Sequence, residues 1–203
     1  MKILCIQGSL GTPAHTATLL GAVISLLGKR DVRPDVLDLR QEVLPFADPS
    51  YHHKPHENPD PAVRRLVERA TAAEGFVLAS PVYHNSYSGV LKNCLDHLHI
   101  NHFADKPVAL CGNGGGNGSV QPVDHLRIVI RGLHGVAIPY NIVSRNTDYE
   151  PADGQFRIVN GDLVKRLRLM VDQLISYTEA FIRIRAPQPE LAPAGVSGNS
   201  SAR

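Results

Sequence analysis

The fold is decided by residues 75–98, which read GFVLASPVYHNSYSGVLKNCLDHL. The first five residues form a short apolar run that stops at Ser80-Pro81, which is typical of a buried strand. Further on, four apolar residues follow one another at i, i+3, i+4 and i+7, the spacing of one helix face: Leu91, Cys94, Leu95 and Leu98. The segment therefore predicts a strand, a loop and a helix, which is the repeating unit of a parallel α/β sheet.

The same alternation continues on both sides of this segment. Other apolar runs predict strands at 3–6, 36–39, 107–111 and 135–139, and helical stripes predict helices at 19–27, 61–70, 126–133 and 163–175. Right-handed crossovers place the helices on both faces of such a sheet. We therefore expect an α/β, three-layer sandwich with a five-stranded parallel sheet in the flavodoxin-like order 2-1-3-4-5.

The chain of 203 residues suits a single domain, which we place at residues 1–185. Residues 40–60 show no periodicity and are predicted to form a long loop. Residues 186–203 are rich in Pro, Ala, Ser and Gly and are predicted to be a disordered tail.

Composition argues against several classes of protein. The net charge of +2 lacks the concentrated basic footprint of a nucleic-acid-binding protein. No apolar run approaches the roughly 20 residues that span a bilayer. The three cysteines are odd in number and form no CxxC motif, so a reducing cytoplasm is the expected location.

In open parallel sheets, ligands bind beyond the carboxyl ends of the strands. The first such loop begins at Gly8, runs into a helix and carries hydroxyls that suit a phosphate at a helix N-terminus: Ser9, Thr12, Thr16 and Thr18. It lacks the Gly-Lys-Ser/Thr ending of nucleoside-triphosphate sites and the G-x-G-x-x-G spacing of dinucleotide sites. The alternative is a hydroxyl-rich helix cap with no ligand.

The second and third loops have different chemistry. Residues 80–89 hold Pro81, Tyr83 and His84, so a flat heteroaromatic ring could lie against this backbone, although the aromatic side chains could equally serve packing, and Ser86 or Ser88 could cap the next helix. Residues 112–118 are rich in glycine, which permits close approach of a ligand or a flexible turn. Together, a phosphate loop, an aromatic loop and a close-approach loop describe a site for flavin mononucleotide (FMN).

Residues 80–96 also closely resemble the segment P-V-Y-x-x-S-x-S-G-x-L-K-x-x-L-D of NAD(P)H-dependent FMN reductases. The resemblance is strongest to the branch that supplies reduced flavin to alkanesulfonate monooxygenases, and it covers roughly residues 1–180. It implies a flavodoxin-like fold, FMN bound between the subunits of a homodimer or homotetramer, and NADPH or NADH as hydride donor. A flavin-dependent monooxygenase is the protein partner that it implies.

The resemblance also assigns site residues in three groups. The phosphate contacts fall on Ser9, Thr16, Ala17 and Thr18; the isoalloxazine contacts on Pro81, Val82, Tyr83, His84, Asn85 and Ser86; and the loop near the flavin ring on Asn113, Gly114, Gly115 and Gly116.

The chain departs from the family pattern at two positions. Gly11 stands where the family often has an arginine in the phosphate loop. His125 stands where the alkanesulfonate branch inserts an aromatic residue in a π-helical turn at its tetramer interface.

Hydride transfer needs orientation of the cofactor rather than a general acid or base, so no catalytic side chain is assigned. No metal site is expected, because the H-x-H-x-x-H spacing of residues 97–102 does not put the three histidines on one helix face. The leading functional hypothesis is an NAD(P)H:FMN oxidoreductase that supplies reduced flavin. The alternatives are an FMN-containing reductase of quinones, azo compounds or metal oxyanions, and a non-catalytic flavin-binding electron carrier.

Overall fold

The computed structural model describes residues 1–186, so the predicted tail lies outside the described residues except for Ala186. The main sheet has six strands: β1 (Lys2–Gln7), β2 (Arg33–Asp38), β3 (Gly75–Pro81), β4 (Pro107–Gly114), β5 (Val136–Ala137) and β6 (Ile142–Arg145). The helices are α1 (His15–Gly28), α2 (Pro61–Ala72), α3 (Gly89–Asp96), α4 (Ile100–Phe103), α5 (Gln121–Gly132) and α6 (Gly161–Arg185). The predicted parallel order is confirmed, since the strands follow one another as β2-β1-β3-β4-β5.

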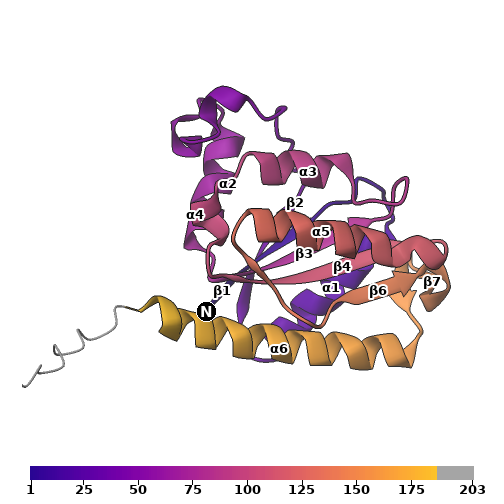
Figure 1. The fold of residues 1–203 in the computed structure, drawn as a ribbon. Coiled ribbons are helices and arrows are strands. Elements are labelled where there is room, and N and C mark those ends of the chain that lie inside the picture. The colour runs from indigo at the N-terminus through magenta and orange to yellow at the C-terminus, as the bar shows by residue number, and fades with distance from the viewer. Residues whose placement is uncertain (187–203) are drawn as a thin grey trace, which may run out of the picture.

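Helices cover both faces of the sheet and produce three layers (Figure 1). Alternate residues of a strand point to opposite faces, so each central strand serves two cores. Leu4 and Leu78 pack on the side of α2, α3 and α5, whereas Cys5 and Val77 pack on the side of α1 and α6. This two-sided burial explains why the central strands read as unbroken apolar runs.

The predicted fifth strand at 135–139 is wrong in its extent. The structure has a two-residue β5, which pairs with the start of β4, and then β6, which pairs with the last part of β4 from Cys111 to Gly114. Pro139 has no N–H for a sheet ladder, so the chain leaves the sheet there and returns three residues later. β5 and β6 therefore both lie beside β4, one along its first half and one along its second, and together they form this edge of the sheet.

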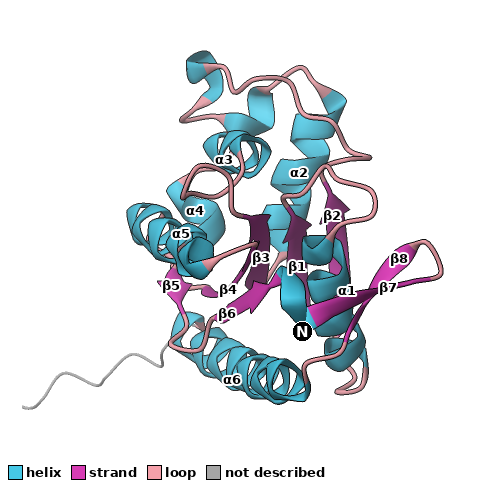
Figure 2. Cartoon of the chain, turned by 90° about the vertical axis from the view of Figure 1, so that its right-hand side faces the viewer, coloured by secondary structure: helices cyan, strands magenta, loops and turns pink. Residues whose placement is uncertain are grey.

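A second sheet was not predicted from the sequence. It is an antiparallel hairpin of β7 (Tyr149–Ala152) and β8 (Gln155–Ile158), closed by Asp153 and Gly154 at φ 47° and 74°. Asp-Gly is a strong signal for a two-residue hairpin turn, and it is the feature that could have revealed this element. The hairpin lies beside α1 (Figure 2).

The loop predicted at 40–60 holds two short 3-10 turns, at Pro49–Tyr51 and Pro55–Glu57, before α2 begins. Within residues 1–186, no helix has both the length and the apolar character needed to cross a membrane. The three cysteines are free and buried, and burial raises the pKa of Cys5 and of Cys94 to about 12. These two thiols therefore stay protonated near neutral pH.

Candidate functional site

The carboxyl ends of β1, β3 and β4 are neighbours in the sheet, at the end that lies away from the N-terminus in Figure 1. Hydrogen bonds join the loops that follow them. Gly8 N donates to Ala79 O at 2.8 Å, and Ser88 Oγ donates back to Gly8 O at 2.6 Å. Val82 N donates to Asn113 O at 2.8 Å. The three loops singled out in the sequence therefore form one continuous rim.

The first loop leads into a helix whose N-terminus has no side-chain cap. α1 follows Ala14, whereas Asp60, Ser88 and Asn160 cap α2, α3 and α6 through their side chains. The N–H groups of the first turn of α1 therefore have no side-chain acceptor. Such groups and the helix dipole suit an anion.

The hydroxyls of this loop fall into two groups. Ser9 and Thr16 are buried at the base of the loop, and Ser9 Oγ accepts a hydrogen bond from Gly11 N at 3.4 Å. Thr18 Oγ1 instead lies 3.4 Å from both Ala14 O and Phe156 O, on the side of the hairpin. Ser9 and Thr16 thus share the loop with the helix start, while Thr18 faces β8.

His15, the first residue of α1, was not singled out from the sequence. Its ring stacks on Phe156 of β8 with centroids 3.8 Å apart, and it also packs against Tyr149 of β7. Burial lowers the pKa of His15, so the neutral imidazole is favoured in this packing. The hairpin thereby fixes the start of α1.

An arginine from the loop after β2 contacts the loop that precedes α1. Arg40, two residues after β2, forms an ion pair with Asp38 and donates to Gly11 O and Thr12 Oγ1. Burial by itself raises the pKa of Asp38, but the hydrogen bonds and charge of Arg40 outweigh it and lower that pKa below its ordinary value. The sequence reasoning missed Arg40, although its position directly after a strand was a usable signal.

In the second loop, the backbone turns sharply between Tyr83 and Ser86. The two residues exchange backbone hydrogen bonds of 2.9 Å, and His84 and Asn85 between them have φ of 47° and 63°. These values are left-handed at both central positions, as in a type I′ turn. The turn presents the exposed ring of Tyr83 at the rim, and Ser88 caps α3, as one of the alternatives predicted.

The third loop begins later than the glycines suggested, because β4 extends through Gly114. Asn113 is therefore a strand residue. Its buried side chain donates to Ser144 Oγ at 3.1 Å, and Tyr149 OH donates to the same oxygen at 2.8 Å. β6 and β7 hold Asn113 in this way, and no local pattern around Asn113 indicates either contact.

The glycines that follow differ in their surroundings. A Cβ on Gly114 would lie 2.8 Å from Val82 Cγ2 and 2.9 Å from Ser119 Oγ, so close packing of the rim requires a glycine there. A Cβ on Gly115 would meet only Asn146 Nδ2, at 3.5 Å, and one on Gly116 would meet nothing within 4 Å. These two glycines leave open space above the rim.

His125 joins the second loop to α5. Its Nδ1 lies 2.9 Å from Ser86 Oγ, and α5 is a regular α-helix from Gln121 to Gly132, without a π-helical turn at His125. The other histidines discussed above serve local contacts. His97 Nε2 lies 2.9 Å from Pro45 O, while His99 and His102 form the cap of α4.

Residues 1–150 match the family model described as NADPH-dependent FMN reductase. The chain belongs to this family. It is an NAD(P)H:FMN oxidoreductase, an enzyme that uses FMN and a reduced nicotinamide.

Similar proteins extend the match beyond residue 150. The chain is 38% identical over 180 residues to an FMN-dependent NADPH-azoreductase of Staphylococcus saprophyticus, covering 88% of this chain and 96% of the relative. It is 36% identical over 178 residues to a protein of the same name from Staphylococcus aureus, covering 87% and 95%. Neither name refers to a monooxygenase.

Solved structures support the flavodoxin-like fold. FerB from Paracoccus denitrificans, a flavoenzyme NAD(P)H:(acceptor) oxidoreductase, superposes with a TM-score of 0.71 at 22% identity, covering 89% of this chain and 98% of FerB. A flavodoxin of Streptococcus pneumonia superposes with a TM-score of 0.58 at 12% identity, covering 86% and 97%.

Proposed function

We propose that this FMN reductase binds FMN along the rim and passes electrons from NADPH to an azo compound. The observation that carries the proposal is the meeting of an uncapped helix start, a strained turn and unobstructed glycines at one sheet edge. The azo acceptor is supported by the staphylococcal relatives, whose names give both FMN and NADPH.

In this proposal, the flavin lies with its phosphate at the start of α1. Ser9, Thr16 and the backbone of Ala17 are the proposed phosphate contacts, and Thr18 supports the helix from the hairpin side, where its Oγ1 lies 3.4 Å from Phe156 O. The isoalloxazine lies against the turn, and the open glycines border it. The proposed contacts are those expected from the sequence: Ser9, Thr16, Ala17, Thr18, Pro81, Val82, Tyr83, His84, Asn85, Ser86, Asn113, Gly114, Gly115 and Gly116.

The residues of the rim have binding and orienting roles. FMN, when bound, supplies the redox chemistry by accepting a hydride from the nicotinamide. The turn at 83–86 is fixed by its two backbone hydrogen bonds and by the contact between Ser86 and His125, so it offers a preformed surface to a ring. The missing side chains of Gly115 and Gly116 leave room for a second ring to approach.

The test is anaerobic oxidation of NADPH with an azo dye and FMN. Cleavage of an azo bond into two amines takes four electrons, so two molecules of NADPH should be consumed per molecule of dye. Protein that does not bind FMN at micromolar concentration, or that oxidises no NADPH with the dye and FMN present, would contradict the proposal.

The same assay distinguishes a second candidate function, which is the supply of reduced FMN to a monooxygenase. The segment 8–14 carries no Lys or Arg of its own, which is compatible with a flavin that exchanges. If FMN behaves as a saturable substrate and the dye is not reduced beyond the rate of free reduced flavin, the supply function is favoured. If FMN stays bound while the dye turns over, the azoreductase is favoured.

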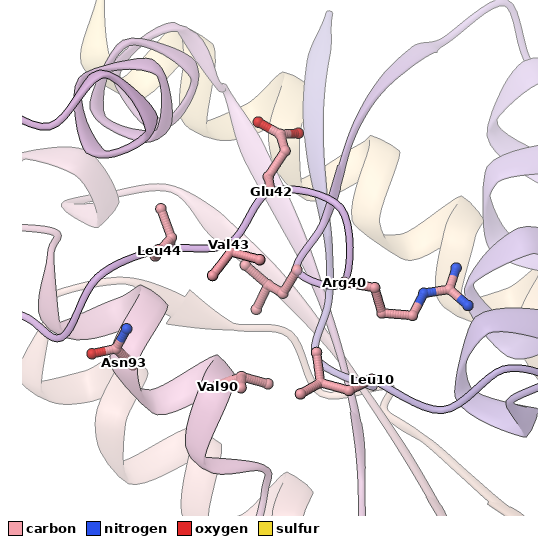
Figure 3. A pocket seen from close by; sticks show the side chains of 8 residues that line it. Leu10, Arg40, Glu42, Val43, Leu44, Val90 and Asn93 are labelled. Carbon is pink, nitrogen blue, oxygen red and sulfur yellow. The ribbon is translucent and has the colours of Figure 1, made fainter.

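We also propose that the enzyme is a homodimer or homotetramer. A groove of about 320 Å³ lies next to the rim, with Leu10, Val43, Leu44 and Val90 around it (Figure 3). Of these residues, Val43 is 75% exposed and Leu10 52%, and Phe46, two residues after Leu44, is 93% exposed. Apolar side chains this exposed and this close together are typical of an interface between subunits.

A further inference from the structure

The segment 8–14 receives its cation from a different loop. It contains no Lys or Arg. Arg40 Nη1 donates to Gly11 O at 3.2 Å and to Thr12 Oγ1 at 3.1 Å. The guanidinium points away from the apolar groove of Figure 3.

The rest of the guanidinium is held by Asp38. Arg40 Nε lies 3.1 Å from both carboxylate oxygens, and Nη2 donates to Oδ2 at 2.5 Å. Together with the two bonds to the loop, these contacts use four of the five N–H groups of an arginine. Arg40 is therefore not a free cation, because most of its charge and donors are already engaged.

Asp38 is in turn connected to the end of β1. Gln7 Nε2 donates to Asp38 Oδ1 at 3.0 Å and to Ser9 O at 3.2 Å. A continuous set of hydrogen bonds thus runs from Gln7 through Asp38 and Arg40 to Thr12. It ties the start of the segment at Ser9 and its middle at Gly11 and Thr12 to β1 and to the loop after β2.

We propose that Arg40 is a positioning residue, which holds Gly11 and Thr12 so that the uncapped start of α1 stays open to the phosphate of FMN. The inference rests on the proposed FMN site. Arg40 acts through the loop rather than by direct contact with the phosphate. Its fork geometry matters because one group must reach a carboxylate and a loop at the same time.

This role makes predictions that differ from those of a simple attracting charge. Arg40→Met and Arg40→Lys should both weaken FMN binding, since lysine keeps the charge but cannot bridge Asp38 and the loop. Asp38→Asn should weaken it as well, because it releases the other end of the guanidinium. A directly attracting charge would instead be preserved in Arg40→Lys and strengthened in Asp38→Asn.

The experiment is titration of FMN and riboflavin, followed by flavin fluorescence, with the wild type and these three variants. Riboflavin lacks the phosphate, so it reports on the ring site alone. We expect the Kd of FMN to rise about tenfold in each variant, the scale of one hydrogen bond to a charged group, and the Kd of riboflavin to change less than twofold. Arg64→Met is the matched control, since Arg64 Nη1 donates to Asn58 O and Pro59 O in another loop and should affect neither flavin.

Three results would overturn the inference: an unchanged Kd of FMN in Arg40→Met, wild-type or tighter FMN binding in Arg40→Lys or Asp38→Asn, or equal weakening for FMN and riboflavin. A failure of the proposed function looks different. In that case the wild type itself binds no FMN, and the inference is lost with it.

Discussion

At the scale of single residues, Gly114 and Gly116 are glycines for different physical reasons. A side chain at Gly114 would collide with Val82, so the protein itself requires the glycine, whereas a side chain at Gly116 would enter empty space. Open space at a glycine also occurs away from the rim, as at Gly21, so only its place beside the proposed flavin site makes Gly116 a candidate for close approach of a ligand.

Gly116→Ala should therefore leave the melting temperature unchanged and raise the Kd of FMN about tenfold. Gly114→Ala should lower stability by about 1–3 kcal/mol through overpacking. Thermal melts without flavin, combined with FMN titrations, separate the two effects. Unchanged FMN binding in Gly116→Ala would remove this glycine from the site.

Lys106 is a buried charge that predicts a dependence of stability on pH. Its Nζ donates to Ala70 O at 3.1 Å and Thr71 O at 3.3 Å, at the end of α2. Burial, reinforced by the charge of Arg185, lowers its pKa to about 8. An unfolded chain keeps this proton up to a pH of about 10.4, so it binds more protons than the folded chain between those values.

The free energy of unfolding should therefore rise from pH 8 to about 10.4 through this group, by up to ~3 kcal/mol relative to Lys106→Met. Below pH 8 both states hold the proton and the contribution is constant. Urea unfolding of both proteins across this range gives the comparison. Curves that stay parallel in pH would show that Lys106 titrates normally.

At the scale of elements, the turn at 83–86 concentrates backbone strain at the rim. Asn85→Val should cost about 1–2 kcal/mol, because a β-branched residue is unfavourable at the φ of 63° found there. Asn85→Gly is the control and should leave stability within a few tenths of a kcal/mol. Chemical denaturation of the two variants tests this, and equal stabilities would argue against a left-handed position.

Among the elements, only those with a sequence pattern of their own could be predicted. The strand that begins at Gly75 and its helix were predictable because both carry their own apolar pattern. β6 was not predictable, since it pairs with the last part of β4, which β5 does not reach, and exists only once that strand is in place. The contact of Arg40 with Gly11 also depends on the sheet order rather than on any local pattern.

At the scale of the whole molecule, the proposed oligomer predicts that Phe46 is covered by another subunit. Phe46→Ser should shift the protein towards monomer without lowering monomer stability, because the ring is 93% exposed within one chain. Light scattering after size exclusion measures the mass. Val159→Ser, at an exposed position between β8 and α6, is a control that tests whether any surface apolar residue has the same effect.

The hydrogen bonds between Gly8, Ala79 and Ser88 have a consequence for protein engineering. Each segment of the rim uses backbone atoms of the next as partners, so a graft that exchanges only one segment with that of a homologue breaks contacts at its borders. Chimeras that transfer residues 8–14 and 80–88 together should retain more activity than those that transfer either alone. Directed evolution of new acceptors is then best carried out on libraries in which both segments vary at once.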